Sequence, residues 1–269
     1  MQFRILGPIA ASHQGQPVHL GPPKQRFVLA VLLAEARQAV TVGQLIDRVW
    51  GQQPPRAARK TLHSYITRIR AILPPPGGDP DSTGLIRRTE GYVLNVPLEQ
   101  VDLHRFRKLT AAAGALDYDD HERACALLRD ALALWRAEPL DGLSSPWAEG
   151  LRTRLDEEHV AAWLQYSDVA LRSEVLPDTL VSGLREMVTS HPLDERLSGQ
   201  LMTALYRCGR QAEALQLYER IRKLLAVQLG IDPSPDLQTV YAQVLAADPA
   251  LNSRRLRRPT PYRLRRHVH

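Results

Sequence analysis

Strand-type patterning is confined to the first hundred residues of this chain, and only helical patterning follows it. Short segments of alternating hydrophobicity occur at residues 2–9, 18–20 and 85–96, each next to a turn signal. After residue 97, apolar residues recur at spacings of three and four in successive segments that are separated by short breaks. We therefore predict a mainly α-helical protein, with a small α+β domain followed by a larger all-α domain.

The charge of the chain divides along the same line. Residues 1–96 contain 12 lysines and arginines against 5 acidic residues, whereas residues 97–250 contain 16 against 24. The last stretch, residues 251–269, contains seven arginines and no acidic residue. Because a basic surface attracts nucleic acid and an acidic surface repels it, we expect the first segment to bind nucleic acid and the second to have another partner.

Composition excludes several classes of protein. With 44% hydrophobic and 24% charged residues among 269, the chain has the profile of a globular domain, and no stretch approaches the ~18 apolar residues of a membrane span. The first residues lack the apolar core of a secretory signal, and two cysteines do not form a disulfide framework. We expect a cytoplasmic protein without a membrane partner.

Two short helices are predicted ahead of the most informative segment. Apolar residues at helical spacing mark the first, over residues 22–37. Thr41 is a suitable N-cap for the second, and Gly51 is a suitable end for it. Lys24 and Arg26 lie at the start of the first helix, where we expect them to contact the DNA backbone.

Residues 55–73 combine one apolar helical face with a polar face that carries only positive charge. The apolar face consists of Leu62, Tyr65, Ile66, Ile69 and Leu73, and the five cations are Arg56, Arg59, Lys60, Arg68 and Arg70. An ordinary surface helix mixes both signs of charge, whereas this segment contains no carboxylate. We predict a recognition helix whose cations bind phosphates or guanine edges, while Thr61, His63, Ser64 and Tyr65 adjust the fit. The alternative is a solvated basic helix without a DNA partner.

A β-hairpin is predicted directly after this helix and a proline-rich loop at residues 74–84. Its strands lie within residues 85–96, with the turn at Glu90 and Gly91. The predicted contacts of the hairpin with DNA are Arg87, Arg88 and Thr89 near the tip and Tyr92 in the second strand. A basic hairpin after a recognition helix is typical of a winged helix-turn-helix, although a hairpin without function remains the alternative.

The order of short motifs resembles a known family. FRILGP, GPPKQRFVLAVLLA, VWG, ARKTLHSYITRIRAIL and TEGYVLNV occur in this order, and together they resemble the DNA-binding half of the Streptomyces antibiotic regulatory protein (SARP) family. That half is an OmpR-type winged helix. The resemblance implies that residues 56–73 contain the recognition helix and that residues 85–96 form the wing. His63 stands where glutamine is common in the family, and we expect this difference to affect base preference.

The helical remainder resembles the second half of the same family. The segment ALYRCGRQAEALQLYERI, at residues 204–221, has a distribution of small and large residues that resembles tetratricopeptide helix pairs. The small residues are Ala204, Gly209 and Ala214, and the large ones are Tyr206, Leu215 and Tyr218. Together with VDLHRF, ALLRDALALW and LGIDPSPDL, this segment is similar to the bacterial transcriptional activation domain. We predict a winged-helix domain over residues 1–97, a tetratricopeptide-like activation domain over 98–250, and a basic, disordered tail over 251–269.

The resemblance also implies a function. Members of the family activate gene clusters for antibiotics or other secondary metabolites, bind direct repeats near promoters as more than one copy, and recruit RNA polymerase with its sigma factor. No catalytic set of residues is evident, and the phosphate-binding GxxxxGK[ST] element is absent, so we expect neither an enzyme nor a cofactor. Two alternatives remain at this stage, namely a tetratricopeptide-type adaptor and a ligand-gated repressor.

Overall fold

The computed structural model describes residues 1–73, 84–173, 176 and 178–252. Most of the predicted loop at 74–84, and the predicted tail from residue 253 onward, lie outside the described residues. The chain forms two compact units, one from residues 1–111 with 130–158 and one from residues 112–129 with those from 159 onward. Among the described helices, none combines the length and the apolar character that crossing a membrane requires.

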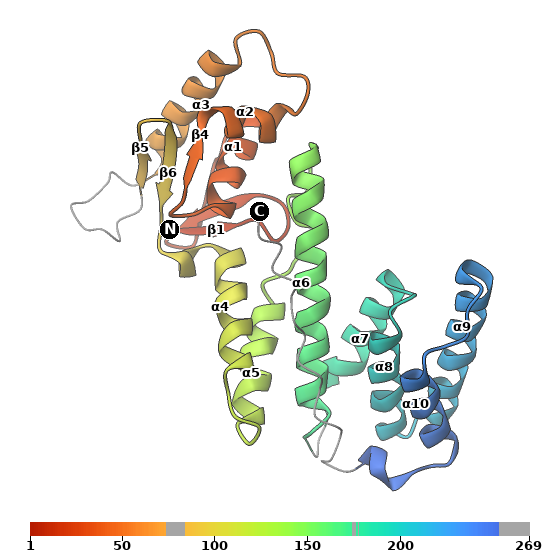
Figure 1. The fold of residues 1–269 in the computed structure, drawn as a ribbon. Helices are drawn as coiled ribbons and strands as arrows, with labels where there is room; N and C mark the ends of the chain where they lie inside the picture. Colours follow the sequence, from red (N-terminus) through yellow and green to blue (C-terminus); the bar gives the residue numbers. More distant parts are fainter. Residues whose placement is uncertain (74–83, 174–175, 177, 253–269) are drawn as a thin grey trace. The chain divides into compact units, whose positions relative to one another are not determined.

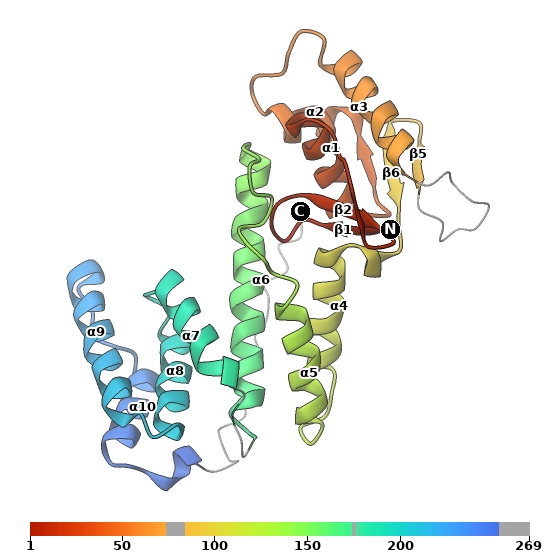
Figure 2. The same cartoon turned by 180° about the vertical axis from the view of Figure 1, so that it is seen from behind.

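The first unit begins with a three-stranded antiparallel sheet. It consists of β1 (Gln2–Arg4), β2 (Ala10–His13) and β3 (Gln16–Val18), in the order β1-β2-β3 (Figure 2). We predicted only two strands here, and that prediction is wrong. The sequence carries no signal for β2, because this strand begins with two alanines, which have low strand propensity. The strand forms because Phe3 pairs with Ala11 and because the two-residue turn Gln14-Gly15 has positive φ at both positions.

Three helices follow in the predicted order. They are α1 (Pro23–Ala34), α2 (Val42–Trp50) and α3 (Ala58–Ile72), labelled in Figure 1. The predicted N-cap is confirmed, because the Thr41 hydroxyl accepts from the Gln44 N–H at 3.1 Å and the Gln44 side chain accepts from the Thr41 N–H at 2.9 Å. Gly51 ends α2 with a φ of 60°. The local signals in the sequence therefore define these helices.

A second sheet carries the predicted hairpin. Strands β5 (Gly84–Arg87) and β6 (Gly91–Asn95) form the hairpin, and β4 (Ala39–Thr41) pairs with β6 to give the order β4-β6-β5. The hairpin is confirmed, and Figure 1 shows it beside α3. The sequence did not predict β4, because three residues are too few for an alternating pattern and this strand is defined by its pairing with β6.

Residues beyond the hairpin complete the first unit. After η1 (Leu98–Gln100) comes α4 (Asp102–Gly114), and the buried Asp102 carboxylate accepts backbone N–H groups from Ile5 and Leu6 at 2.9–3.0 Å and from Leu103 at 2.8 Å. Burial raises the pKa of this carboxyl, since desolvation outweighs the N–H donors that lower it. Asp102 thus joins the N-terminal strand to the start of α4.

We expect Asp102→Ala to lower the free energy of unfolding of the full chain by about 3 kcal/mol, because it leaves buried N–H donors without an acceptor. Asp102→Asn should cost less, since the amide oxygen still accepts from Ile5 or Leu6. Urea unfolding followed by tryptophan fluorescence measures both. Glu99→Ala is the matched control, because this carboxylate is exposed and pairs with the exposed Lys108, so its removal should leave the urea midpoint close to that of wild type.

A segment far along the chain also packs within the first unit. It runs from the end of α5 (His121–Leu132) into the first half of α6 (Pro146–Ala170). The Ser145 hydroxyl donates to the Arg48 carbonyl at 2.7 Å, and the Trp147 ring lies 6.0 Å from the Phe27 ring. The predicted domain boundary at residue 97 stays a prediction, and the compact first unit includes residues on both sides of it.

The second unit is helical throughout its described residues. After α6 it contains α7 (Asp178–Ser190), α8 (Glu195–Arg207), α9 (Gln211–Leu229), α10 (Pro235–Leu245) and η2 (Pro249–Asn252). The side chains of Asp194 and Ser234 cap α8 and α10, and Gly230 ends α9 in the left-handed conformation. Of the three small residues in the tetratricopeptide-like pattern, Ala204 and Ala214 are buried, whereas Gly209 is exposed. The predicted fold class is confirmed.

Candidate nucleic-acid interface

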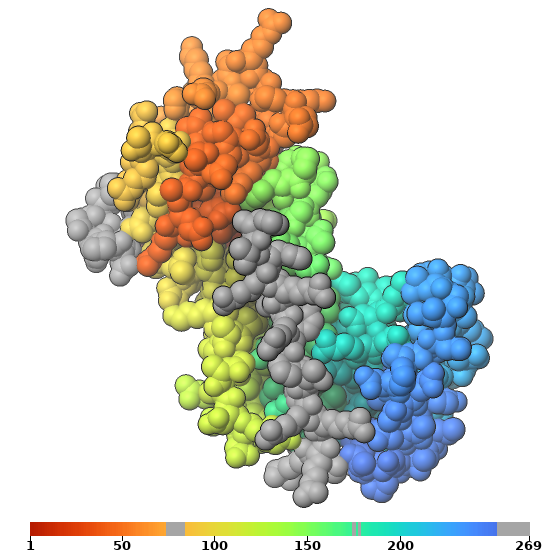
Figure 3. Space-filling view, in the orientation of Figure 1, coloured from red at the N-terminus to blue at the C-terminus, as the bar shows by residue number. Residues whose placement is uncertain are grey.

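Helix α3 has the two faces that the sequence predicted. Ala58, Leu62, Ile66 and Ile69 are buried against the rest of the first unit. The opposite face is exposed, and it consists of Arg59, Lys60, His63, Ser64, Thr67, Arg68, Arg70 and Ala71. Figure 3 shows the orange surface of this region with long side chains that extend into solvent. The exposed face carries four cations and no carboxylate, so it attracts polyanions.

One row of side chains lies opposite the buried face. Lys60, Ser64, Thr67 and Ala71 follow one another at spacings of four, three and four, so they project from the same side of the helix. Ser64 and Thr67 donate their hydroxyl hydrogens to the backbone carbonyls of Lys60 and His63, which leaves their lone pairs free to accept. Thr67 was not among the predicted contacts, although its spacing from Ser64 was a sufficient signal.

The first turn of α3 has features that favour a bound anion. The N-cap residue Ala57 offers no side-chain hydrogen bond, and the first turn contains no acidic residue. Arg56, Arg59 and Lys60 are exposed there instead. Cations at a helix N-terminus are disfavoured by the helix dipole, and the N–H groups of this first turn lack a side-chain acceptor, although the Ala58 N–H donates to the Pro55 carbonyl at 2.9 Å. A phosphate at this position would relieve both costs.

Arg70 and Tyr92 connect α3 to the hairpin. Arg70 Nε donates to the Leu85 carbonyl at 3.1 Å, and its guanidinium lies 5.8 Å from the centre of the Tyr92 ring. The His63 ring meets Tyr92 edge-on, with 6.4 Å between ring centres. The Tyr92 side chain is buried, with 3% of its surface exposed, so the prediction of a direct DNA contact is corrected to a supporting role beneath His63 and Arg70.

The tip of the hairpin is exposed as predicted. Arg87, Arg88 and Thr89 are solvent-accessible, and so is Glu90 at the turn. The tip is held in place by backbone hydrogen bonds, from the Arg88 N–H to the Gly91 carbonyl at 2.9 Å and from the Val42 N–H to the Glu90 carbonyl at 3.1 Å. Two arginines at a fixed tip suit contacts with a neighbouring phosphate backbone or minor groove.

Four predicted contacts are less accessible. Thr61 and Tyr65 are half-buried on the flank of α3, where the Tyr65 ring stacks on Trp50 at 6.4 Å. The Lys24 ammonium donates to the Val49 carbonyl at 2.8 Å, so this lysine supplies a hydrogen-bond donor to a carbonyl in the last turn of α2. Arg26 is half-buried, and its Nε has no acceptor among the described residues. Among the predicted contacts, the accessible cations therefore lie on α3, just before it and at the hairpin tip.

The side chains of this surface are suited to binding a polyanion. It presents guanidinium, ammonium, imidazole and hydroxyl groups on one helix, with a basic hairpin beside it. Within the parts of the chain that the structure describes, no group of three or more His, Cys, Asp or Glu side chains is placed to hold a metal ion. A winged helix with this surface, joined to a helical unit, defines a transcription regulator of two parts.

Comparison with known proteins agrees with this class. Residues 15–94 match the model "Transcriptional regulatory protein, C terminal", and residues 101–245 match "Bacterial transcriptional activator domain". Regulatory protein DnrI from Streptomyces peucetius is 32% identical over 94% of each chain. Regulatory protein AfsR from Streptomyces coelicolor is 40% identical over 93% of this chain, which spans only 25% of AfsR. The chain belongs to the SARP family of transcriptional activators.

A solved structure supports the same assignment. Mycobacterium tuberculosis EmbR, determined in complex with a low-affinity phosphopeptide, superposes with a TM-score of 0.79 at 33% identity. The match covers 91% of this chain and 65% of the EmbR chain. The chain thus spans about two thirds of the EmbR structure and a quarter of the length of AfsR. The shared part contains both the winged helix and the helical unit.

Proposed function

We propose that this protein is a sequence-specific DNA-binding activator of transcription, acting on a gene cluster for an antibiotic or another secondary metabolite. The observation that carries the proposal is the exposed face of α3, which presents cations, hydroxyls and an imidazole without one carboxylate. Membership in the SARP family supports the proposal that the protein activates transcription.

The accessible residues divide into two kinds of contact. Lys60, His63, Ser64 and Thr67 project from the centre of the exposed face, where base edges in the major groove would meet them. Arg56, Arg59 and Arg68 lie around them and bind phosphates, as do Arg87, Arg88 and Thr89 at the hairpin tip. Thr61, Tyr65 and Arg70 sit at the margins of this surface, and Lys24 and Arg26 contribute long-range positive charge.

The arrangement on DNA and the protein partners are also proposals. We propose that copies bind head-to-tail on direct repeats near promoters, and that the helical unit and part of the winged helix recruit RNA polymerase and its sigma factor. This places the protein in the bacterial cytoplasm, on the nucleoid. Family likeness supports these points, and a selection of bound sites from random DNA duplexes tests the first of them. Two copies of one motif in the same orientation are expected, and an inverted repeat or a single motif would contradict the arrangement.

The DNA-binding proposal is tested by the double variant Lys60→Ala/Arg68→Ala. Both side chains are exposed and neither packs against the hairpin, in contrast to Arg70, so the fold should be retained. We expect affinity for the selected duplex to fall about 10- to 100-fold, because each base contact contributes ~1–3 kcal/mol of binding free energy. The slope of log affinity against log salt should fall by about one for each phosphate contact that is removed. Fluorescence anisotropy over a salt series measures both quantities.

The matched control is Arg105→Ala, which removes an exposed arginine from α4 of the same unit. It should leave both affinity and salt slope within about twofold of wild type. If the double variant and wild type bind the selected duplex with equal affinity, and their circular dichroism spectra agree, then α3 is not part of the DNA interface.

A further inference from the structure

A row of exposed side chains runs along α9 in the second unit. Gln216, Arg220, Lys223 and Val227 follow one another at spacings of four, three and four, so they project from one side of the helix. The buried residues of α9 lie on its other side. We call these four residues the α9 stripe, and they form the side of the helix that faces solvent.

The stripe ends in a group of exposed apolar side chains. Val227 is 85% exposed, and Leu229 and Ile231 at the end of the helix are 54% and 49% exposed. Three of the six large hydrophobic side chains that are exposed among the described residues therefore lie within five residues of one another. Apolar side chains that gather on a surface indicate a protein partner, because phosphate groups gain nothing from contact with them.

The two cations of the stripe are not neutralised within the described chain. Arg220 and Lys223 are exposed, and neither has a carboxylate partner there. Residues 220–231 contain three cations and no acidic residue, and of these cations it is Arg222 that forms an ion pair, at 2.8 Å. The next acidic residue, Asp232, lies beyond the end of the helix. The stripe therefore combines an excess of positive charge with an apolar end.

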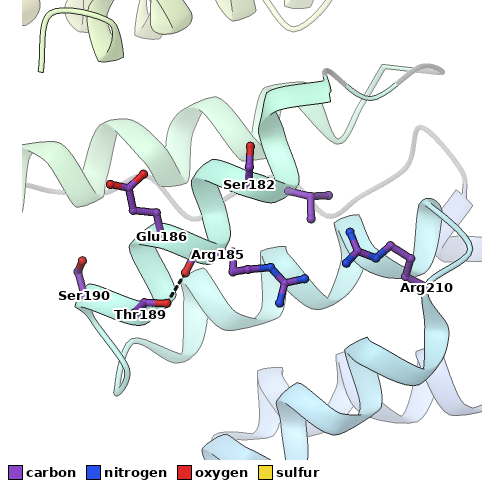
Figure 4. A pocket seen from close by; sticks show the side chains of 7 residues that line it. Ser182, Arg185, Glu186, Thr189, Ser190 and Arg210 are labelled. Atoms are coloured by element: carbon purple, nitrogen blue, oxygen red, sulfur yellow. Dashed lines mark hydrogen bonds between the residues drawn. The ribbon is translucent and has the colours of Figure 1, made fainter. Parts of the chain in front are cut away.

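The groove along α7 has no such excess. Its volume is about 590 Å³, and Arg185 and Arg210 extend toward one another there from α7 and from the turn before α9 (Figure 4). Both guanidinium groups already bind the carboxylate of Glu213, at 3.1 and 2.8 Å, and Glu186 adds a second carboxylate to the lining. Because its charges balance, the groove selects neither an acidic nor a basic partner.

A second surface of the same unit complements the α9 stripe. Residues 117–122, between α4 and α5, contain four acidic residues and no lysine or arginine. These acidic side chains are exposed and have no ion-pair partner in the part of the chain that the structure describes; they are Asp117, Asp119, Asp120 and Glu122. Tyr118 is 48% exposed, and its ring lies 4.4 Å from the guanidinium of Arg172. We call residues 117–122 the acidic turn, which combines carboxylates with an exposed aromatic ring.

We propose that the α9 stripe of one copy of this chain binds the acidic turn of a second copy. Arg220 and Lys223 pair with carboxylates of the turn, and Tyr118 packs against Val227. Figures 1 and 2 show α9 and the turn between α4 and α5 on opposite sides of the second unit, so the two surfaces of one copy do not meet. A contact between two different surfaces repeats head to tail, as copies on direct repeats would require. That the contact forms on DNA rests on the proposed function.

Charge reversal tests this contact without DNA. Arg220→Glu/Lys223→Glu reverses the stripe, and Asp117→Lys/Asp119→Lys reverses the turn while keeping the acidic residues at the start of α5, which the helix dipole favours. In sedimentation equilibrium of the full chain at low salt, the mean mass of wild type should rise with concentration. Each variant alone should associate at least about tenfold more weakly, because attractive pairs become repulsive. An equimolar mixture of the two variants should associate again, since each reversed surface then meets a surface of opposite charge.

Arg105→Glu/Lys108→Glu is the matched control, because it reverses two exposed cations with the same spacing on α4, outside both surfaces. It should associate like wild type. A duplex with two motifs gives a second measurement, in which both reversal variants should bind with less cooperativity than wild type. Their affinity for a duplex with one motif should not change. If wild type bound neither duplex, the proposed function would fail, and the sedimentation test of this contact would still stand.

Three results would overturn the proposal. One is a mean mass of wild type that stays constant with concentration, and another is a mixture of the two variants that does not associate. The third is weaker binding of the stripe variant to the duplex with one motif, which would make the stripe a DNA contact. Thermal unfolding by circular dichroism verifies the fold of each variant, which should be retained because every altered side chain is exposed.

Discussion

Gly91→Ala should abolish most of the stability of the first unit, lowering its free energy of unfolding by about 4 kcal/mol or more, which is the range of severe backbone and packing defects. A Cβ atom at Gly91 would lie 2.0 Å from the Val40 carbonyl oxygen and 2.7 Å from the Thr41 Cα. Both neighbours are backbone atoms of β4, which pairs with β6 at this position. The clash can be relieved only by separating the two strands.

The surroundings of β4 prevent an easy adjustment. Val40 is buried, with 2% of its surface exposed, and Thr41 is the N-cap of α2 through its capping box with Gln44. A shift of β4 by more than about 1 Å would therefore disturb the sheet, the core and the cap of α2 together. Because the same strand pair supports the hairpin, we also expect affinity for DNA to fall with stability.

Gly43→Ala is the matched control for Gly91→Ala. Gly43 is exposed in α2 of the same unit, and a Cβ there would meet only the Thr41 hydroxyl oxygen at 3.9 Å, an ordinary contact. Alanine is favoured over glycine inside a helix by up to about 1 kcal/mol, so this variant should be neutral or more stable. Urea unfolding compares the two, and a Gly91→Ala protein within about 1 kcal/mol of wild type would contradict the role of this close approach.

Gly183→Ala is expected to destabilise the second unit by about 3 kcal/mol, at the upper end of typical overpacking costs. A Cβ atom there would lie 2.0 Å from Cη2 of Trp163 and within 2.8 Å of two further ring atoms. The indole is held in place, because its Nε1 donates to His159 Nε2 at 3.1 Å and its ring meets Tyr166 edge-on at 5.7 Å. Substitution in α7 therefore forces the helix away from the ring.

The direction of the stability change in Gly183→Ala shows whether the Trp163 indole blocks a side chain at this position. Gly183 lies inside a helix, where replacement by alanine would ordinarily stabilise by up to about 1 kcal/mol. Gly199→Ala in α8 provides the comparison, since its Cβ would meet Leu237 and Val240 side chains at 3.6 and 3.9 Å. We expect thermal unfolding to place Gly199→Ala at or above wild type and Gly183→Ala well below it. A stabilised Gly183→Ala protein would show that the indole moves freely.

Much of the candidate interface could be predicted from the sequence, because its signals are local. Residues three and four apart in a helix share a face, so the apolar and basic faces of α3 follow from spacing alone. Thr41 and Gly51 define the limits of α2 through hydrogen bonds and φ values within a few residues. The hairpin follows in the same way from alternation on both sides of a glycine-containing turn.

Only the tertiary structure decided which predicted contacts remain accessible. Lys24 binds the Val49 carbonyl and Tyr92 is buried beneath His63, and neither fact depends on neighbours in the chain. Strands β2 and β4 likewise exist because of partners elsewhere in their sheets. Arg185 on α7 and Arg210 before α9 reach the same Glu213 carboxylate, and no local pattern in the sequence marks that pairing.

By itself, then, the sequence determined a basic recognition helix, a hairpin beside it and a helical remainder, since each is defined by local periodicity and charge. The close approaches at Gly91 and Gly183, the buried Asp102 and the accessible set of cations were decided only in three dimensions. The physical reason is that backbone periodicity is a property of neighbouring residues. Burial and steric contact instead depend on segments that only the folded chain brings together.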